Sequence, residues 1–139
     1  MRAWDPGRVT PTQQRSTARW LWPLVADLLC VLALAIGGKG AHEPGESAWV
    51  VLAIAWPFAV AAGLAHLWLA LRARPTRRAW PEGAIVLVAT YGIGMFLRAI
   101  AGRGLAPAFL VVAGLFLAVT MGGWRGVAHL ASRRRGERA

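Results

Sequence analysis

The chain has 139 residues, of which 57% are apolar, and it carries 16 Lys and Arg against 6 Asp and Glu, for a formal net charge of +10. These charges fall in blocks that are separated by long uncharged stretches. This pattern excludes a soluble domain, in which charges are spread over amphipathic helices or strands. Cys30 is the only cysteine, so an intrachain disulfide and a multi-cysteine metal site are also excluded. The composition therefore predicts an integral membrane protein.

Four stretches are long and apolar enough to cross a hydrocarbon core about 30 Å thick, which takes about 20 helical residues. The predicted spans are residues 20–38, 48–71, 83–101 and 105–131. The fold class is therefore all-α, an integral membrane four-helix bundle. Three parts of the chain follow from these spans, namely a basic tail over residues 1–19, a transmembrane domain over 20–131 and an Arg-rich tail over 132–139. We expect both tails to be disordered.

The first stretch also has a second interpretation, as a secretory signal. Its basic start, its apolar run and the segment Ala33-Leu34-Ala35 resemble a signal peptide with an Ala-x-Ala cleavage site. Asp27 lies inside the apolar run and weakens this match. Cleavage would leave three spans instead of four.

The basic residues predict how the bundle is oriented. Most of the Arg residues lie before the first span, between the second and third spans, or at the end of the fourth. The other side of the membrane holds only Lys39, Arg98 and Arg103. Because cytoplasmic loops carry an excess of Lys and Arg, both termini are predicted to be cytoplasmic. This orientation accounts for the basic clusters, so we do not expect a nucleic-acid partner.

Asp27 is the polar residue with the largest consequences. It lies about seven residues, or roughly 10 Å, past the cytoplasmic end of the first span, where a carboxylate is costly unless it is paired, hydrated or protonated. Arg125 lies at a comparable depth near the inner end of the fourth span, and His66 near the inner end of the second is a further neighbour. Two hypotheses stay open. Asp27 and Arg125 form a buried ion pair that fixes helix register, or Asp27 exchanges a proton or binds a cation during transport.

A second polar group is predicted on the outer side. The Gly-rich first connection contains Lys39 and His42, and Arg98 lies about one turn from the outer end of the third span. One hypothesis is that these residues converge on an anion, which the backbone N–H groups of the connection would also favour. The other is a tight turn and an Arg98 side chain that extends to the membrane surface. The spacing does not match a phosphate loop.

No catalytic constellation is visible in the sequence. His42, His66 and His129 do not have the spacing of metal ligands on a helix, so we expect no metal and no cofactor. The serines lie outside the spans, and no Gly-x-Ser-x-Gly elbow occurs. The sequence therefore assigns no catalytic residue and leaves enzymatic activity uncertain.

Small residues predict where helices approach closely. Gly114, Ala118, Gly122 and Gly126 recur every four residues along the fourth span. Such a stripe allows another helix to pack closely against it. That helix belongs either to the same chain or to a second copy across a dimer seam.

Several short motifs occur in an order that resembles a known family. They are Asp27, Gly38-Lys39-Gly40-Ala41-His42, Trp56-Pro57-Phe58, Gly94-Met95-Phe96-Leu97-Arg98, Phe109-Leu110-Val111-Val112-Ala113 and Gly123-Trp124-Arg125. From about Val25 to Arg125, the chain resembles the prokaryotic membrane proteins described as domain of unknown function 3054. The resemblance implies a small four-span protein of a prokaryotic plasma membrane and adds weight to Asp27, His42, Arg98 and Arg125, but it implies no activity. The family has Arg where this chain has Lys39, which keeps the charge but removes the bidentate fork.

Three functions stay open at this point. The sequence slightly favours a non-catalytic accessory protein, or partner platform, in which the Asp27–Arg125 pair is structural. The first alternative is a small dimeric transporter or permease with Asp27 as its coupling carboxylate and Arg98 near the outer entrance. The second is a membrane enzyme that acts on a lipid substrate.

The expected partners are the lipid bilayer and either a second copy or another membrane protein. Transport predicts that water reaches Asp27, whereas a platform predicts a dry, fully paired carboxylate.

Overall fold

The computed structural model describes residues 11–40 and 48–136, and the side chains of residues 21–38 and 48–134. The elements are α1 (Pro11–Gly40), α2 (Ala48–Leu71), a short π-helical turn η1 (Ala79–Gly83), α3 (Ala84–Ile100) and α4 (Pro107–Gly136). All four α-helical regions, with η1 leading into α3, are long and apolar enough to cross a membrane. The prediction of an all-α four-helix membrane bundle is confirmed, and the chain is a multi-pass membrane protein.

The ends of the first and last helices differ from the predicted spans. α1 begins at Pro11 and so includes residues 11–19, which precede the predicted first span. α4 continues past Ser132 to Gly136, into the segment expected to be a disordered tail. Hydropathy marks where a helix leaves the hydrocarbon core, but a helix continues into polar sequence until a residue interrupts it. The remainder of the two expected tails, residues 1–10 and 137–139, lies outside the described residues.

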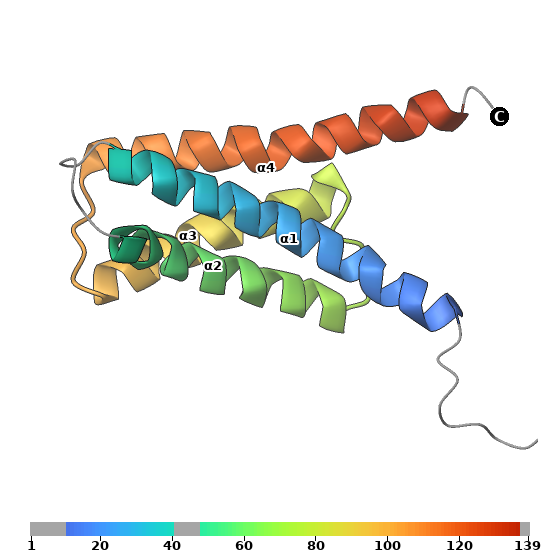
Figure 1. Cartoon of the computed structure of the whole chain (residues 1–139), viewed down its shortest axis with the longest axis horizontal. Coiled ribbons are helices and arrows are strands. Elements are labelled where there is room, and N and C mark those ends of the chain that lie inside the picture. The colour runs from blue at the N-terminus through green and yellow to red at the C-terminus, as the bar shows by residue number, and fades with distance from the viewer. Residues whose placement is uncertain (1–10, 41–47, 137–139) are drawn as a thin grey trace, which may run out of the picture.

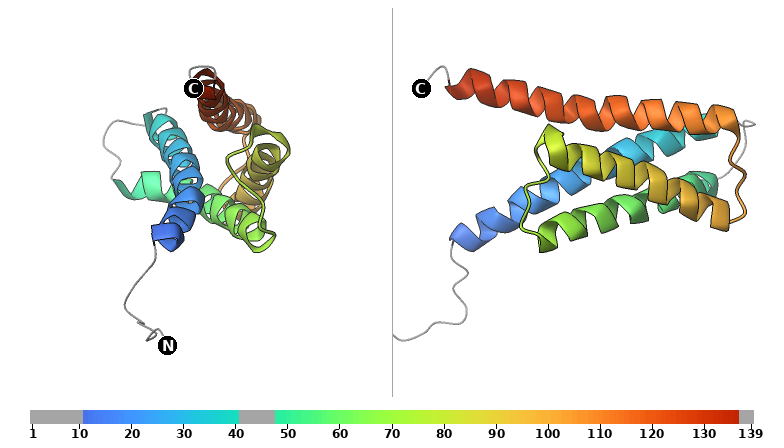
Figure 2. Two further views of the ribbon diagram at one scale, coloured as in Figure 1. Left: turned by 90° about the vertical axis from the view of Figure 1, so that its right-hand side faces the viewer. Right: turned by 180° about the vertical axis from the view of Figure 1, so that it is seen from behind.

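The four helices lie side by side along one long axis (Figure 1). The start of α1, the connection from α2 to α3 and the end of α4 lie at one end, which we call the α2–α3 end. The connection from α3 to α4 lies at the opposite end, together with the end of α1 and the start of α2, and we call this the α3–α4 end. Viewed end-on, the helices follow one another around the bundle (Figure 2), and the main packing pairs are α1 with α2, α2 with α3, α3 with α4 and α1 with α4.

The core between the helices is apolar and receives side chains from all four. Its buried members are Val31, Leu34, Phe58, Ala65, Leu69, Val86, Met95, Ala113, Leu117 and Met121. Many large apolar side chains face outward instead, among them Trp49, Leu71 and Val119. A monomeric soluble protein rarely exposes so much contiguous apolar surface, whereas a bilayer covers it.

Two glycines show where α3 is approached closely. A Cβ atom added at Gly94 would lie 2.9 Å from Cε1 of the buried Phe58 ring, so the absence of a side chain lets α2 and α3 pack together. A Cβ atom at Gly114 of α4 would lie 3.3 Å from Cε2 of Tyr91 in α3. The predicted small-residue stripe on α4 therefore packs within the monomer at Gly114. At Gly122, an added Cβ atom would meet nothing within 4 Å among the described residues.

Candidate functional site

Asp27 lies in the apolar interior of the bundle, where Arg125 binds it with two hydrogen bonds. Its side chain, on α1, is 0% exposed. Arg125 on α4 donates from Nη1 to Oδ1 at 2.8 Å and from Nη2 to Oδ2 at 2.6 Å. This two-pronged geometry is the strongest form of an Arg–carboxylate contact, and it joins α1 to α4. The sequence placed the two residues at comparable depth, and the structure brings them into direct contact.

Two further donors complete the surroundings of the carboxylate. Trp124, the residue before Arg125, donates from Nε1 to Oδ1 at 2.8 Å. His66 on α2 places Nε2 at 2.8 Å from Oδ2. Because an ionised carboxylate can only accept hydrogen bonds, this His66 nitrogen carries the hydrogen and donates it. We call Asp27, His66, Trp124 and Arg125 the Asp27 cluster; it links α1, α2 and α4.

Arg125 has further contacts that hold it in place. Its Nη1 also donates to the carbonyl oxygen of Met121 at 3.0 Å, and its Nε donates to that of Thr76 at 3.4 Å. A Cβ atom at Gly83 would lie 2.7 Å from Cδ of Arg125, so a glycine is needed for the side chain to pass. The connection from α2 to α3 therefore packs onto Arg125, which is only 2% exposed.

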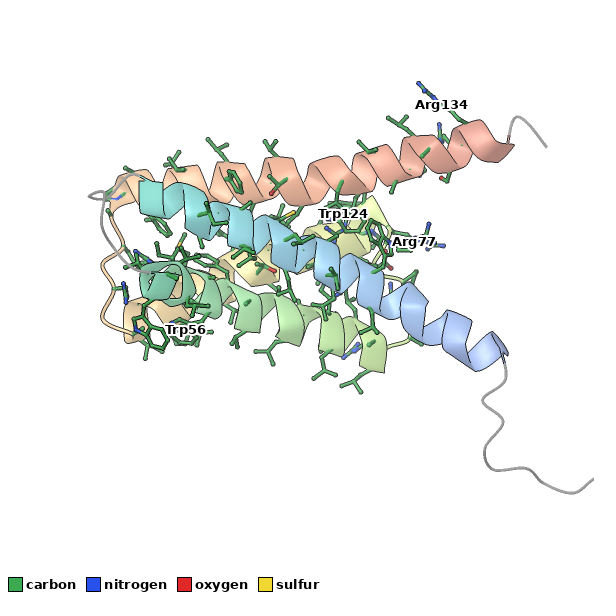
Figure 3. All side chains as sticks on the ribbon, in the orientation of Figure 1. Trp56, Arg77, Trp124 and Arg134 are labelled. Atoms are coloured by element: carbon green, nitrogen blue, oxygen red, sulfur yellow. The ribbon has the colours of Figure 1, made fainter. Side chains whose placement is uncertain are left out.

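Trp124 packs into the interface of α4 with α1. Figure 3 shows it between these two helices, toward the same end as Arg77, whereas Trp56 lies toward the α3–α4 end. Its ring lies edge-on to that of Trp22 of α1, with centroids 5.1 Å apart, and the Arg125 guanidinium lies 4.3 Å from its centroid. The indole therefore fills space next to the ion pair and donates to it at the same time.

The chemistry available to the Asp27 cluster follows from its hydrogen bonding and charge. A carboxylate offers about four lone-pair positions, and the four N–H donors of Arg125, Trp124 and His66 use them. The charges of Asp27 and Arg125 cancel, and their side chains are 0% and 1% exposed. In this arrangement no carboxylate oxygen is left to receive a substrate or a cation.

Sequence reasoning missed a second buried carboxylate at the α2–α3 end. Glu82 in η1 is 2% exposed, and its Oε1 lies 3.5 Å from Nη1 of Arg74. Among the described residues, its Oε2 has no hydrogen-bond partner, and neither does Oγ1 of the buried Thr76. The signal available in the sequence was that Glu82 is a single acidic residue next to an Arg-rich connection. Glu82 falls between Trp80-Pro81 and Gly83-Ala84, and this local sequence does not indicate that its side chain turns inward.

The predicted outer-side group is only partly described. His42 and the side chain of Lys39 lie outside the described residues. Arg98 lies in the last turn of α3, at the α3–α4 end, and its guanidinium carbon is 4.1 Å from the centroid of the Phe109 ring on α4. The structure therefore places Arg98 at the opposite end of the bundle from the Asp27 cluster.

Within residues 11–40 and 48–136, no group of three or more His, Cys, Asp or Glu side chains is arranged to hold a metal ion. Two of the histidines are described. His66 faces Asp27, and His129 is exposed on α4. Cys30 is half-buried with a free thiol.

One comparison with known proteins gives a match. The model of the family described as protein of unknown function, DUF3054, matches residues 24–128. The matched segment includes the Asp27 cluster, Arg98 and most of the four helices. No curated protein and no solved structure matches the chain.

Proposed function

The chain belongs to the DUF3054 family, and we propose that it is a non-catalytic accessory protein of a prokaryotic plasma membrane, whose bundle serves as a platform for a partner membrane protein. The observation that carries this proposal is the buried carboxylate of Asp27, whose oxygens accept four hydrogen bonds from Arg125, Trp124 and His66. A coupling carboxylate must reach water or substrate at some stage of transport. A carboxylate with every acceptor position used is suited instead to hold helices in register.

The energetics of buried ion pairs support this role. Forming such a pair gains little net stability, because desolvation offsets the attraction, but removing one partner is costly. A pair of this kind therefore penalises every arrangement of α1 and α4 that separates Asp27 from Arg125. Because His66 of α2 also hydrogen-bonds to Asp27, an arrangement that moves α2 away from α1 would leave the carboxylate without this donor as well.

A small dimeric transporter or permease is the second candidate, and the contact between His66 and Asp27 favours it. Histidine is the side chain whose ordinary pKa lies closest to neutral pH, and an ionisable pair within a membrane span is a common element of proton pathways. In this role Asp27 would be the coupling carboxylate, and the cluster would have to open to water during each cycle.

Exchange of indole hydrogens distinguishes a dry cluster from one that opens. We expect the Trp124 indole N–H to be protected from exchange with D2O for hours, because it is hydrogen-bonded to Asp27. Trp80, whose side chain is 79% exposed, provides the matched control and should exchange at once. The measurement is NMR of protein labelled with ¹⁵N-tryptophan, with the Trp124 signal assigned by Trp124→Phe.

Proton flux into liposomes tests the same distinction functionally. We expect liposomes containing the protein to take up no more protons than empty liposomes, as reported by a pH-sensitive dye. This result should be the same for wild type, for Asp27→Asn and for the exposed control Arg133→Gln. Uptake by wild type and Arg133→Gln that disappears in a folded Asp27→Asn variant, together with rapid exchange at Trp124, would establish transport and refute the platform.

We further propose that both termini face the cytoplasm, since most of the cations lie at the α2–α3 end or in the terminal segments of the chain. The test uses a Cys30→Ser background with one new cysteine at an exposed position. Gly104→Cys at the α3–α4 end should react with a membrane-impermeant maleimide in intact spheroplasts. Ala79→Cys at the α2–α3 end should react only after permeabilisation. The reverse pattern would invert the proposed orientation.

A further inference from the structure

Arg98 points into the bundle at the α3–α4 end. It follows Gly94 by four residues, so both lie on the same face of α3, and Gly94 contacts Phe58 of α2. The guanidinium of Arg98 lies over Phe109 of α4, whose ring in turn packs against Phe58 with centroids 6.3 Å apart. The side chain is therefore directed between α2 and α4 and is held there by an aromatic platform.

Two donor nitrogens of this guanidinium are buried without a partner. Nε and Nη1 of Arg98 are buried and donate to no acceptor among the described residues. Five N–H groups make Arg a residue whose burial is costly unless they are satisfied. The Phe109 ring attracts the charge of the guanidinium through its face, but it provides no hydrogen-bond acceptor for the N–H groups at the edge.

Among the residues that the structure describes, the charges around Arg98 are all of one sign. Asp27 and Glu82 are the only acidic residues in the described part of the chain, and both lie toward the α2–α3 end, next to Arg125 and Arg74. Arg103 lies close enough to Arg98 to interact with it electrostatically. Nothing in this end of the described structure neutralises Arg98.

The start of α4 adds to this positive potential. The N–H of Leu110 donates to the carbonyl oxygen of Ala106, which places the N-cap at an alanine whose side chain cannot accept a hydrogen bond. The first turn of α4 contains no acidic residue. The positive end of the helix dipole therefore faces the same region as Arg98, and residues 11–40 and 48–136 place no carboxylate there.

We propose that Arg98 binds a phosphate-type oxyanion at the α3–α4 end, with Phe109 as the platform that orients the guanidinium. The geometry of guanidinium N–H groups matches phosphate oxygens, and Arg98 lies in the last turn of a membrane span, near the depth of lipid phosphates. The same chemistry is offered by the headgroup of an anionic phospholipid and by inorganic phosphate from solution. This proposal is independent of the platform function, because it concerns the opposite end of the bundle from Asp27.

The test measures thermal unfolding of the purified protein in a neutral detergent against increasing inorganic phosphate, with chloride at matched ionic strength as reference. A parallel series uses nanodiscs of phosphatidylcholine with increasing phosphatidylglycerol. We expect a saturable rise in melting temperature in at least one series, because a ligand that binds only the folded state stabilises it. A rise with phosphate identifies the free anion, and a rise with phosphatidylglycerol alone identifies the lipid headgroup.

Variants of two arginines at the same end show whether the site is specific. Arg98→Gln should weaken the apparent affinity about tenfold or more, since a charge-assisted hydrogen bond is lost. Arg98→Lys keeps the charge and should weaken the apparent affinity less. This variant provides the comparison if Arg98→Gln does not fold. Arg103→Gln makes the same change in net charge at an exposed position and should retain the saturable response.

Three results would overturn the proposal. The first is no saturable response in either series. The second is an equal loss in Arg98→Gln and Arg103→Gln, which would indicate only diffuse electrostatic attraction. The third is strong coupling between Arg98→Gln and either Glu43→Gln or Glu46→Gln in a double-mutant cycle of stability, which would make a carboxylate of the chain itself the counter-ion of Arg98.

Discussion

Asp27→Asn is expected to lower the free energy of unfolding by about 3–5 kcal/mol, because it leaves Arg125 buried without its counter-charge. The replacement has nearly the same volume, so the loss reports charge and hydrogen bonding and not a cavity. The asparagine amide also replaces one of the two acceptor oxygens with an NH2 donor, which would face an N–H of Arg125 and that of either Trp124 or His66. Unfolding of the purified protein in mixed micelles, monitored by circular dichroism, measures the change.

A double-mutant cycle isolates the coupling between the two charges. Arg125→Gln is expected to be similarly destabilising, and the Asp27→Asn/Arg125→Gln double variant should lose less than the sum of the two, with a coupling of about 1 kcal/mol or more. Arg133→Gln, an exposed position on the same helix, is the matched control and should stay within about 0.5 kcal/mol of wild type. Stability that is unchanged by Asp27→Asn, with no coupling to Arg125, would show that the carboxylate is free for solvent or substrate and would favour transport.

The second large effect is expected at Gly94. Gly94→Ala should destabilise the protein by about 1–3 kcal/mol, because the new methyl group would overlap the Phe58 ring, which is 0% exposed and cannot move without repacking. The matched control is Gly92→Ala, also within α3, where an added Cβ atom meets nothing within 4 Å in the described part of the chain. That variant should be neutral or stabilised by up to about 1 kcal/mol, since alanine is the better helix former.

A compensating substitution tests the mechanism of this loss. Phe58→Leu removes part of the ring that the new methyl group would meet, so it should restore stability to Gly94→Ala while destabilising the wild-type background. Equal stability of Gly94→Ala and Gly92→Ala would contradict the close approach of α2 and α3 at this position.

The sequence alone determined the architecture, because the bilayer imposes a length and a polarity on whatever crosses it. The uncharged stretches located all four membrane-crossing helices, and the bounds predicted for α2 are those of the structure. The cost of a carboxylate in hydrocarbon singled out Asp27, and depth along the predicted spans indicated Arg125 and His66 as neighbours. Depth is readable from sequence because a helix rises by a fixed amount per residue.

Only the tertiary structure decided which way each helix faces. Helices that are apolar on nearly every side carry little information about their rotation, so the sequence did not show that Trp124 donates to Asp27 or that Arg98 stacks on Phe109. The burial of Glu82 and the contact between Gly94 and Phe58 depend in the same way on packing between segments distant in sequence. The physical reason is that membrane helices associate through side-chain fit and hydrogen bonds between partners, and these are properties of pairs of helices and not of any one span.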